Sequence, residues 1–431
     1  MKSLIRNYTI YILHLFLLLL LISCNTSGQQ AEGAAQAGDN AGLILPEGFK
    51  AVVVADNLGP GRHIDINENG DIYMTLQSMS SGHGIVALRD TSGDSHADVV
   101  EYFGNYAGTG MEVHDGYLYF GGDTMILRYR LSPGRLLPQE EPVVLAGGFP
   151  MQNQHSDKTF AIDDKGYIYA NVGAPSNACM ERTRTRGSPG IDPCPQLNRQ
   201  AGIWRFSLNR MNQRQAEDGY RYATGIRNAV ALDWNVKEAE LYAVMHGRDQ
   251  LHQFFPDLYT EEENAQLPSE EFLLVREGSD FGWPYCYYDH LKGQKVLAPE
   301  YGGDGNITGR CEDKDDPIMG FPGHLAPNDL LFYTGTQYPE KYRNGAFICF
   351  HGSWNRAPLE QEGFYVAFVP FGGELPSGDW EVFAGGFAGT DYVSSPSEAE
   401  YRPMGIAMGK DGSLYVSDSK KGRIWKIFYD N

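Results

Sequence analysis

Basic side chains are scarce in this sequence. Its 431 residues include 35 lysines and arginines against 55 aspartates and glutamates, which gives a formal net charge of -20. A chain this acidic repels nucleic acids and anionic membrane surfaces, so we expect neither as a binding partner. Any anionic ligand must therefore be held by a local cluster of basic residues that acts against the charge of the whole chain.

The cysteines do not have the spacing of a zinc site, and no Cys-x-x-Cys-His sequence is present for covalent haem attachment. A built-in electron carrier is therefore not expected. Four cysteines bracket two loops, Cys179 with Cys194 and Cys286 with Cys311, and in an exported protein each pair is expected to form a disulfide. Cys349 lies in an apolar stretch and is expected to be a buried thiol.

Long apolar runs are also rare, and the clearest one lies near the N-terminus. A positively charged start, an apolar segment and small residues before Cys24 are typical of a secretory signal, and a cysteine at this place resembles the lipidation site of a bacterial lipoprotein. We expect residues 1–23 to be the signal peptide and residues 24–42, rich in Gly, Ala and Gln, to be a flexible tether. An uncleaved transmembrane anchor is the alternative, but the run is short for a bilayer span. The expected location is the bacterial cell envelope, on the periplasmic face of a membrane or at the cell surface.

Helix-like periodicity is nearly absent, and the 51 glycines and 12% aromatic residues indicate strands and turns instead. One unit recurs: a short apolar strand, a turn, and a second strand that opens on Gly-x-Ile-Tyr or a variant. Six copies are found, at residues 63–73, 111–119, 159–169, 230–243, 330–348 and 404–416. Such repeated hairpins predict an all-β fold, a six-bladed β-propeller of four-stranded antiparallel blades over residues 43–431. A β-sandwich with coincidental turns is the alternative.

The residues at the start of each inner strand form the candidate site, because the inner strands of a propeller run along the central axis and their starts surround one mouth. Through the six copies this position is occupied by Arg62 and His63, Thr109, His155, Arg227 and Asn228, His324, and Arg402. Any single residue of this kind is more often structural. Three arginines and three histidines at equivalent positions in an acidic protein predict a site for an anionic ligand with a base nearby, since histidine titrates near neutrality.

Five phrases occur in a fixed order along the chain: residues 225–228 (Gly-Ile-Arg-Asn), 246–251 (His-Gly-Arg-Asp-Gln-Leu), 280–285 (Asp-Phe-Gly-Trp-Pro-Tyr), 351–356 (His-Gly-Ser-Trp-Asn-Arg) and 401–405 (Tyr-Arg-Pro-Met-Gly). Together they resemble the glucose/sorbosone dehydrogenases, and within that group the sorbosone and pyranose dehydrogenases that depend on pyrroloquinoline quinone (PQQ). The resemblance covers residues 45–429. It implies a six-bladed propeller that holds PQQ and calcium at its axial mouth and oxidises a sugar or sugar aldehyde. The electrons would pass to a separate acceptor, a cytochrome or a quinone.

The resemblance also implies roles for individual residues. His155 matches the catalytic base, which takes the proton from the sugar hydroxyl while a hydride moves to the quinone. Arg227 and Asn228 match residues that contact the quinone carbonyls, where preorganised donors stabilise the negative charge that develops. Arg402 matches an arginine that meets the cofactor's carboxylates. The further cofactor-binding residues expected around the mouth are Arg62, His63, Thr109, His324, Trp354 and Arg356, and the carbonyl oxygens of Gly247 and Arg248 are expected to bind calcium.

The sequence departs from the glucose enzymes at the base. In those enzymes a loop supplies an acidic partner for it, and the corresponding residues here, 172–177, contain no acid. His155 is therefore expected to be oriented by Asp157, by Asn177 or by water. Arg248 also replaces a proline of the glucose enzymes. These departures favour the sorbosone/pyranose branch of the group.

Two other functions fit a propeller. A calcium-dependent hydrolase of the lactonase kind needs several Asp, Glu or Asn side chains around an axial metal, whereas the strand starts here offer arginine and histidine. A non-catalytic carbohydrate-binding propeller is the second alternative, because this fold serves many functions.

Overall fold

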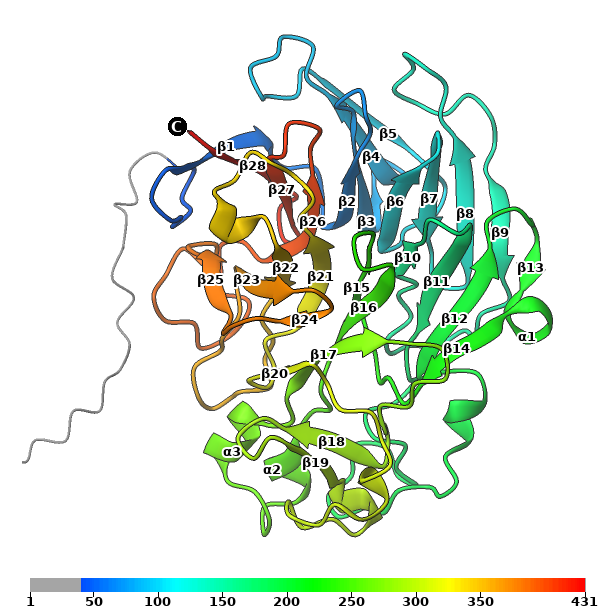
Figure 1. Ribbon diagram of the computed structural model, residues 1–431, viewed down its shortest axis with the longest axis vertical. Helices are drawn as coiled ribbons and strands as arrows, with labels where there is room; N and C mark the ends of the chain where they lie inside the picture. The colour runs from blue at the N-terminus through cyan, green and yellow to red at the C-terminus, as the bar shows by residue number, and fades with distance from the viewer. Residues whose placement is uncertain (1–39, 431) are drawn as a thin grey trace, which may run out of the picture. The chain divides into compact units, whose positions relative to one another are not determined.

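The computed structural model describes residues 40–430 (Figure 1). The expected signal peptide, the expected lipidation site Cys24 and almost all of the expected tether lie outside the described residues. Within residues 40–430, no helix is long and apolar enough to cross a membrane. Strands dominate the described chain, and they form the six-bladed β-propeller that the repeat predicts.

Six antiparallel sheets follow one another as blades, each starting from an inner strand (Figure 1). From the inner strand outward, the first blade is β2 (Gly61–Ile66), β3 (Ile72–Ser80), β4 (His83–Arg89) and β5 (Val99–Phe103). The second is β6 (Gly110–His114), β7 (Tyr117–Gly121), β8 (Met125–Arg130) and β9 (Val143–Gly147), extended by β13 (Gln213–Arg214). The third is β10 (Phe160–Ile162), β11 (Tyr167–Val172), β12 (Gly202–Ser207) and β14 (Tyr220–Thr224). The fourth is β15 (Ala231–Asn235), β16 (Glu240–Met245), β17 (Glu270–Val275) and β20 (Met319–Phe321); the fifth is β21 (Pro327–Phe332), β22 (Gly345–Phe350), β23 (Tyr365–Gly372) and β25 (Glu381–Ala384), with β24 (Leu375–Pro376) beside β23. The connections carry the short helices α1 (Gln215–Asp218), α2 (Leu251–Phe254) and α3 (Glu261–Gln266), and the hairpin of β18 (Cys286–Asp289) and β19 (Gln294–Leu297).

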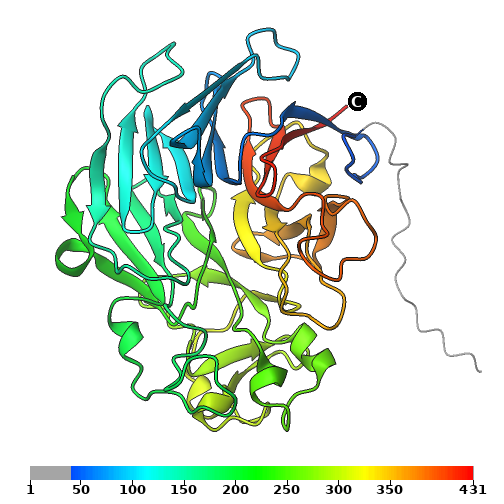
Figure 2. The same cartoon turned by 180° about the vertical axis from the view of Figure 1, so that it is seen from behind.

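The sixth blade is built from both ends of the described chain. β26 (Pro403–Met408), β27 (Leu414–Asp418) and β28 (Ile424–Tyr429) supply its inner three strands. β1 (Phe49–Ala55) pairs antiparallel with β28 and supplies the outer one, seen as blue beside red in Figures 1 and 2. This pairing closes the ring, so no blade is left as an open end.

Large apolar side chains fill the space between neighbouring blades. Between the fourth and fifth blades, for example, the Tyr242 ring lies 4.6 Å from that of Phe332 and 5.8 Å from that of Phe371. Cys349 is buried in the fifth blade as a free thiol, as predicted. Tilted and edge-to-face aromatic contacts of this kind hold each sheet face against the next.

Carboxylates link the inner strands around the axis. Asp65 accepts a hydrogen bond from the Val113 N–H at 2.6 Å, and Asp233 accepts one from the Phe332 N–H at 2.6 Å. These side chains border an axial cavity of about 200 Å³. Burial raises the pKa of Asp65 to about 6 and that of Asp233 to about 7. The inner strands are thus joined across blades by groups that are costly to ionise.

Two disulfides staple the long connections of the third and fourth blades. The bonded pairs are Cys179–Cys194 and Cys286–Cys311, as predicted from the sequence. We call residues 174–200 and 280–316 together the stapled module. Disulfides of this kind are typical of proteins that fold in an oxidising compartment.

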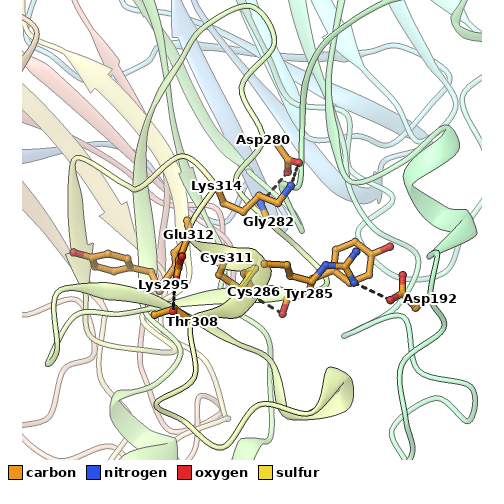
Figure 3. The surroundings of a disulfide bond; sticks show 12 residues. Asp192, Asp280, Gly282, Tyr285, Cys286, Lys295, Thr308, Cys311, Glu312 and Lys314 are labelled. Carbon is orange, nitrogen blue, oxygen red and sulfur yellow. Dashed lines mark hydrogen bonds and ion pairs between the residues drawn. A yellow bond between two sulfur atoms is a disulfide. The ribbon is translucent and has the colours of Figure 1, made fainter.

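The two halves of the stapled module are bonded to each other. Figure 3 shows the second disulfide beside Tyr285, whose hydroxyl accepts a 2.8 Å hydrogen bond from the Cys194 N–H. Arg310 lies over the Tyr285 ring, 3.9 Å from its centroid, and donates to the Asp192 carboxylate at 2.8 Å. Asp192 belongs to the first half and Arg310 to the second, so the two loops behave as one unit.

Candidate active site

The starts of the first three inner strands are tied together by one charged cluster. Arg62, in β2, donates through Nε to the Thr109 hydroxyl at 3.0 Å, and its Nη2 lies 3.2 Å from the Asp157 carboxylate. The Thr109 hydroxyl in turn donates to Asp157. Two of these residues are candidates from the sequence, and the structure brings them together; Asp157 joins them from the start of the third blade.

Arg227 enters the mouth just before β15 and is almost completely buried, with 3% of its surface exposed. Its Nε donates to the Asn177 carbonyl at 3.2 Å, and Nη1 donates to the Gly247 carbonyl at 2.9 Å. Its Nη2 donates to the Asn177 side-chain oxygen at 3.0 Å and to the Asp249 carboxylate at 2.9 Å. Four of the five guanidinium N–H groups are therefore used, which fixes the plane of the group and leaves one N–H on Nη1.

Asn228 and His155 are brought together by a glycine. The Asn228 side-chain oxygen accepts a 3.0 Å hydrogen bond from Asn171 Nδ2. A Cβ atom placed on Gly173 would lie 2.6 Å from that oxygen and 2.6 Å from the Cβ of His155. Only a residue without a side chain allows the base candidate to lie this close to the Arg227-Asn228 segment.

His155 is held by a backbone carbonyl. Its Nδ1 lies 2.6 Å from the carbonyl oxygen of Ala174. A carbonyl can only accept, so Nδ1 carries the proton and Nε2 keeps its lone pair. Burial, and after it the charge of Arg227, lowers the pKa of His155 to about 3. The imidazole is neutral at ordinary pH, with an unprotonated Nε2.

The expected partners of His155 are engaged elsewhere. Asp157 pairs with Arg62, and the Asn177 side chain is hydrogen-bonded to Arg227 and to the backbone carbonyl of Asp249. The expectation that one of these two side chains orients the base is wrong, because the Ala174 carbonyl takes that position. Every residue has a main-chain carbonyl, so the amino-acid sequence does not indicate which carbonyl takes the place of the missing acidic partner.

The loop that carries His155 is fixed by one amide. Gln152 Nε2 lies within hydrogen-bond distance of the Gln154 carbonyl at 2.7 Å, the His155 carbonyl at 2.8 Å and the Gly173 carbonyl at 3.0 Å. His155 itself has a φ of +52°, a left-handed conformation that costs energy for a residue with a side chain. The amide contacts stabilise this turn and so fix the direction of the ring.

Arg402, just before β26, forms the opposite side of the candidate site. Its Nε donates to the His351 carbonyl at 3.2 Å, and its Nη2 donates to His351 Nδ1 at 2.9 Å and to the Gly352 carbonyl at 2.5 Å. Nη1 has no partner among the described residues and is therefore available to a ligand. Burial lowers the pKa of Arg402 to about 10, which still leaves the group charged.

Further histidines around the mouth are neutral. The Nε2 atoms of His63, His246 and His324 each donate to a carbonyl, at 2.7 to 2.8 Å. Burial lowers the pKa of each to about 4. His351 also stays neutral, because burial and then the charges of Arg402 and Arg62 lower its pKa. Among these side chains, the positive charge is thus carried by the arginines and not by the histidines.

His246 and His351 were not among the side chains expected from the sequence, although both open phrases that carried the resemblance. The same is true of Asp249, in the phrase 246–251, which contacts Arg227. Their place in those phrases is the signal that marks them in the sequence, although none of the three lies at the start of an inner strand.

Trp354 and Arg356 differ in their surroundings. Trp354 is 52% exposed. Arg356 is buried, and its guanidinium donates to the Ala265 carbonyl at 2.6 Å and to the Glu362 carboxylate at 2.5 Å. Its N–H groups are largely used within the rim of the mouth. A ligand-binding role for either residue stays a prediction.

The Gly247 carbonyl oxygen, which is predicted to bind calcium, already accepts a hydrogen bond. The Gly247 oxygen accepts from Arg227, so a cation bound at the same oxygen would lie against a guanidinium. Among the described residues, no group of three or more His, Cys, Asp and Glu side chains could hold a metal ion. The residues present therefore do not fit a calcium site in this arrangement.

An open cavity adjoins His155. It has a volume of about 320 Å³, and its lining includes Gln77, Thr109, Asn153 and Asp157. The wall is almost entirely polar, with amide, hydroxyl and carboxylate groups. A space of this size beside a neutral base suits a small polar molecule.

Solved structures with this fold are known. The chain is 17% identical to the holo form of the pyranose dehydrogenase PQQ domain from Coprinopsis cinerea, covering 90% of this chain and 97% of that one with a TM-score of 0.71. It is 16% identical to the calcium structure of Trichoderma reesei carbohydrate-active enzymes family AA12, covering 92% of this chain and 99% of that one with a TM-score of 0.73. At these identities the likeness establishes the six-bladed fold.

A curated relative adds little on function. An uncharacterized protein of Borreliella burgdorferi is 26% identical over 210 residues, which are 48% of each protein. The chain thus spans about half the length of the curated relative that it matches. The family described as TrAA12-like matches residues 43–430, almost the whole of the described chain. The resemblance seen in the sequence is confirmed on its pyranose dehydrogenase side: this chain belongs to the TrAA12-like family.

Proposed function

We propose that this chain is a PQQ-dependent oxidoreductase that oxidises a sugar or a sugar aldehyde and passes the electrons to an external acceptor. The observation that carries the proposal is His155, a neutral imidazole whose Nε2 has no partner among the described residues, in the same mouth of a TrAA12-like propeller as the fixed guanidinium of Arg227. One solved relative of this fold is named as a pyranose dehydrogenase PQQ domain in its holo form.

The arginines of the mouth suit a polyanionic, carbonyl-bearing cofactor. Arg402 has an unpartnered Nη1, and Arg227 has one unpartnered N–H on Nη1, among the described residues. Both guanidinium groups are held by backbone carbonyls, so they need little reorganisation to bind an anion. PQQ, when bound, would supply the quinone that accepts a hydride. Arg402 would bind its carboxylates and Arg227 with Asn228 its carbonyl oxygens.

The chain's own residues would do the acid–base work. His155 Nε2 would accept the proton of the sugar hydroxyl that is oxidised, and the Ala174 carbonyl would then hold the imidazolium through Nδ1. Arg227 would keep a fixed positive charge where negative charge develops, a kind of contact whose loss costs about 100- to 1,000-fold in rate. The polar cavity beside His155 would bind the hydroxyl groups of the substrate.

Calcium would bind at the carbonyls of Gly247 and Arg248 only if Arg227 moved away from the first of them. We therefore derive no step of the reaction from calcium. Titrating PQQ into the protein with calcium and with a calcium chelator measures whether the ion contributes. Equal affinity in both would remove calcium from the proposal.

The location and the electron acceptor belong to the same proposal. Two disulfides, together with the expected lipidated Cys24, support an envelope-anchored protein that donates electrons to a separate cytochrome or quinone. Metabolic labelling with a palmitate analogue, compared between the wild type and Cys24→Ala, tests the anchor. An unlabelled wild-type protein would overturn it.

The central experiment is reconstitution. The purified protein is mixed with PQQ, and the reduction of an artificial electron-acceptor dye is followed over a panel of aldoses and sugar aldehydes. We expect PQQ-dependent dye reduction with at least one sugar. Absence of PQQ binding at micromolar concentrations would overturn the proposal, and lactone hydrolysis in calcium without PQQ would favour a hydrolase instead.

A further inference from the structure

Asp249 is the carboxylate around which the cationic side of the mouth is built. Its Oδ2 accepts from Arg227 Nη2 at 2.9 Å and from Arg184 Nη2 at 2.8 Å. Its Oδ1 accepts from Asn355 Nδ2 at 2.7 Å. Its side chain is 13% exposed. Burial opposes ionisation, but the charges of Arg227 and Arg184 outweigh it and hold the pKa of Asp249 well below its usual range.

Asn177 completes the contact from the other side. Its side-chain oxygen accepts both from Arg227 Nη2 at 3.0 Å and from the Asp249 N–H at 2.8 Å. Its Nδ2 donates to the Asp249 carbonyl at 2.9 Å. Asn177 and Asp249 therefore form one rigid pair of acceptors for the same nitrogen of Arg227.

Arg227 depends on this pair because it is buried. With 3% of its surface exposed, its nearest anionic partner is Asp249, and its other acceptors are neutral oxygens. A buried cation that loses its counter-charge is strongly unfavourable, so the guanidinium would turn towards solvent or towards another anion. Its plane in the mouth would then be lost.

The stapled module supplies most of these contacts. Asn177 and Arg184 come from the half closed by Cys179–Cys194, and the Trp283 indole N–H of the other half donates to the Asn177 carbonyl at 3.1 Å. The segment that carries Asp249 is also held through its neighbour: Arg248 Nη2 donates to Glu300 at 2.5 Å, and both side chains are buried. The module is thus bonded to both residues 248 and 249.

We propose that Asp249 is a positioning residue that sets the Arg227 guanidinium for the cofactor and transmits the rigidity of the stapled module to it. The catalytic part of this inference rests on the proposed function. The positional part, that Arg227 is placed by Asp249, does not.

If Asp249 acted only through its negative charge, its replacement would change PQQ affinity in the opposite direction from that expected for a positioning residue. Asp249→Asn removes one negative charge from a mouth that would receive an anion, so a purely electrostatic role predicts tighter PQQ binding. A positioning role predicts weaker binding, by about tenfold or more, because a buried charge pair is broken. It also predicts a fall in kcat of up to about 100-fold with the KM of the sugar little changed.

The full chain carrying D249N is compared with the wild type by PQQ titration and by steady-state kinetics. D313N is the matched control: it makes the same charge change in the stapled module, at an exposed carboxylate away from Arg227. We expect D313N to behave as the wild type. The double variant D249N with Arg227→Lys should lose little more than Arg227→Lys alone, since Asp249 acts through Arg227.

A crystal structure of D249N without cofactor gives a readout that needs no activity. We expect the Arg227 guanidinium to leave its place beside Asn177. If the wild type binds no PQQ, the proposed function fails while this displacement still tests the positional inference. Arg227 unmoved in D249N, or PQQ bound as tightly as in the wild type or tighter, would overturn the inference.

Asp249→Glu keeps the charge and covers the case in which D249N does not fold. The added methylene moves the carboxylate, so Arg227 can stay paired but not in the same plane. We expect PQQ affinity and kcat between those of the wild type and of Arg227→Lys. Wild-type values for D249E would contradict a positioning role, because the place of the carboxylate would then be unimportant.

Discussion

Nδ1 of His155 lies 2.6 Å from the carbonyl oxygen of Ala174, in the segment 172–177, which contains no acidic residue. A carboxylate partner would raise the basicity of the ring by its charge, whereas a carbonyl orients the ring with a dipole only. The tautomer is the same in both cases, with the lone pair on Nε2. The propeller therefore presents a correctly directed but weak base, which is neutral over the whole range of physiological pH.

The first prediction concerns the base. Replacing His155 by Gln should lower kcat by about 100- to 10,000-fold, the usual contribution of a positioned general base. PQQ affinity should change little, because the arginines remain in place. Dye-reduction kinetics and a PQQ titration measure the two quantities. His96→Gln, at an exposed histidine, is the control, and a His155→Gln variant with near wild-type kcat would remove His155 from the mechanism.

The second prediction concerns the protonation of His155. Because its pKa is lowered to about 3, the ring should stay neutral, with the proton on Nδ1, from pH 8 down to pH 5. Nitrogen NMR of the unloaded protein, labelled at histidine, distinguishes the Nδ1–H tautomer from the Nε2–H tautomer and from the cation. A His155 signal that titrates near pH 6.5 would show that the ring is solvated and not held by Ala174.

The propeller could be predicted from the sequence because its signal is repeated. The strand–turn–strand unit that begins at His63 returns five times, and each copy became the inner pair of a blade. The disulfides could also be predicted, since each pair of cysteines brackets one loop. The contacts of Arg227 could not be predicted, because they join it to Asn177 and Asp249, which lie 50 and 22 positions away. Both residues belong to connections whose course no periodicity describes. The role of the Ala174 carbonyl as the partner of His155 was even less predictable, since every residue has a carbonyl group.

The third prediction follows from the axial carboxylates. Burial raises the pKa of Asp233 from 3.8 to about 7, so the folded protein binds this proton more tightly than the unfolded chain does. The stability that the proton contributes is present below pH 4 and is lost as the pH rises towards 7. Asp233→Asn stays neutral and can still accept from Phe332. It should therefore raise the free energy of unfolding at pH 8, by about 1.4 kcal/mol for each unit of pKa shift that is removed.

Urea unfolding at pH 4, 6 and 8 checks this difference. The gain in Asp233→Asn should be large at pH 8 and small at pH 4. Asp115→Asn, at a carboxylate with 88% of its side chain exposed, should show no such dependence. A loss of stability at pH 8 in Asp233→Asn would mean that the carboxylate is ionised and needed in the folded protein.

The fourth prediction separates the two disulfides. Replacing Cys179 and Cys194 by Ser removes a link between positions 15 apart and should lower the free energy of unfolding by about 3 kcal/mol. It should also weaken PQQ binding, because Arg184 lies inside the loop that this link closes and Asn177 lies just before Cys179. The Cys286–Cys311 pair links positions 25 apart and encloses neither of these residues, so its removal should cost similar stability with a smaller loss of affinity. Equal losses of affinity in both variants would show that the loops do not act separately on Arg227.

The last prediction tests how closely the base must approach Asn228. Gly173→Ala places a Cβ atom 2.6 Å from both the Asn228 side-chain oxygen and the His155 Cβ, well inside van der Waals contact. The two residues must move apart, so kcat should fall even though no catalytic group is removed, and a misplacement of about 1 Å can cost about 100-fold. Gly147→Ala is the matched control, because its Cβ would meet no atom closer than 3.5 Å. Unchanged kcat in Gly173→Ala would mean that the distance between His155 and Asn228 does not control the reaction, and the pair would then have to be assigned separate roles.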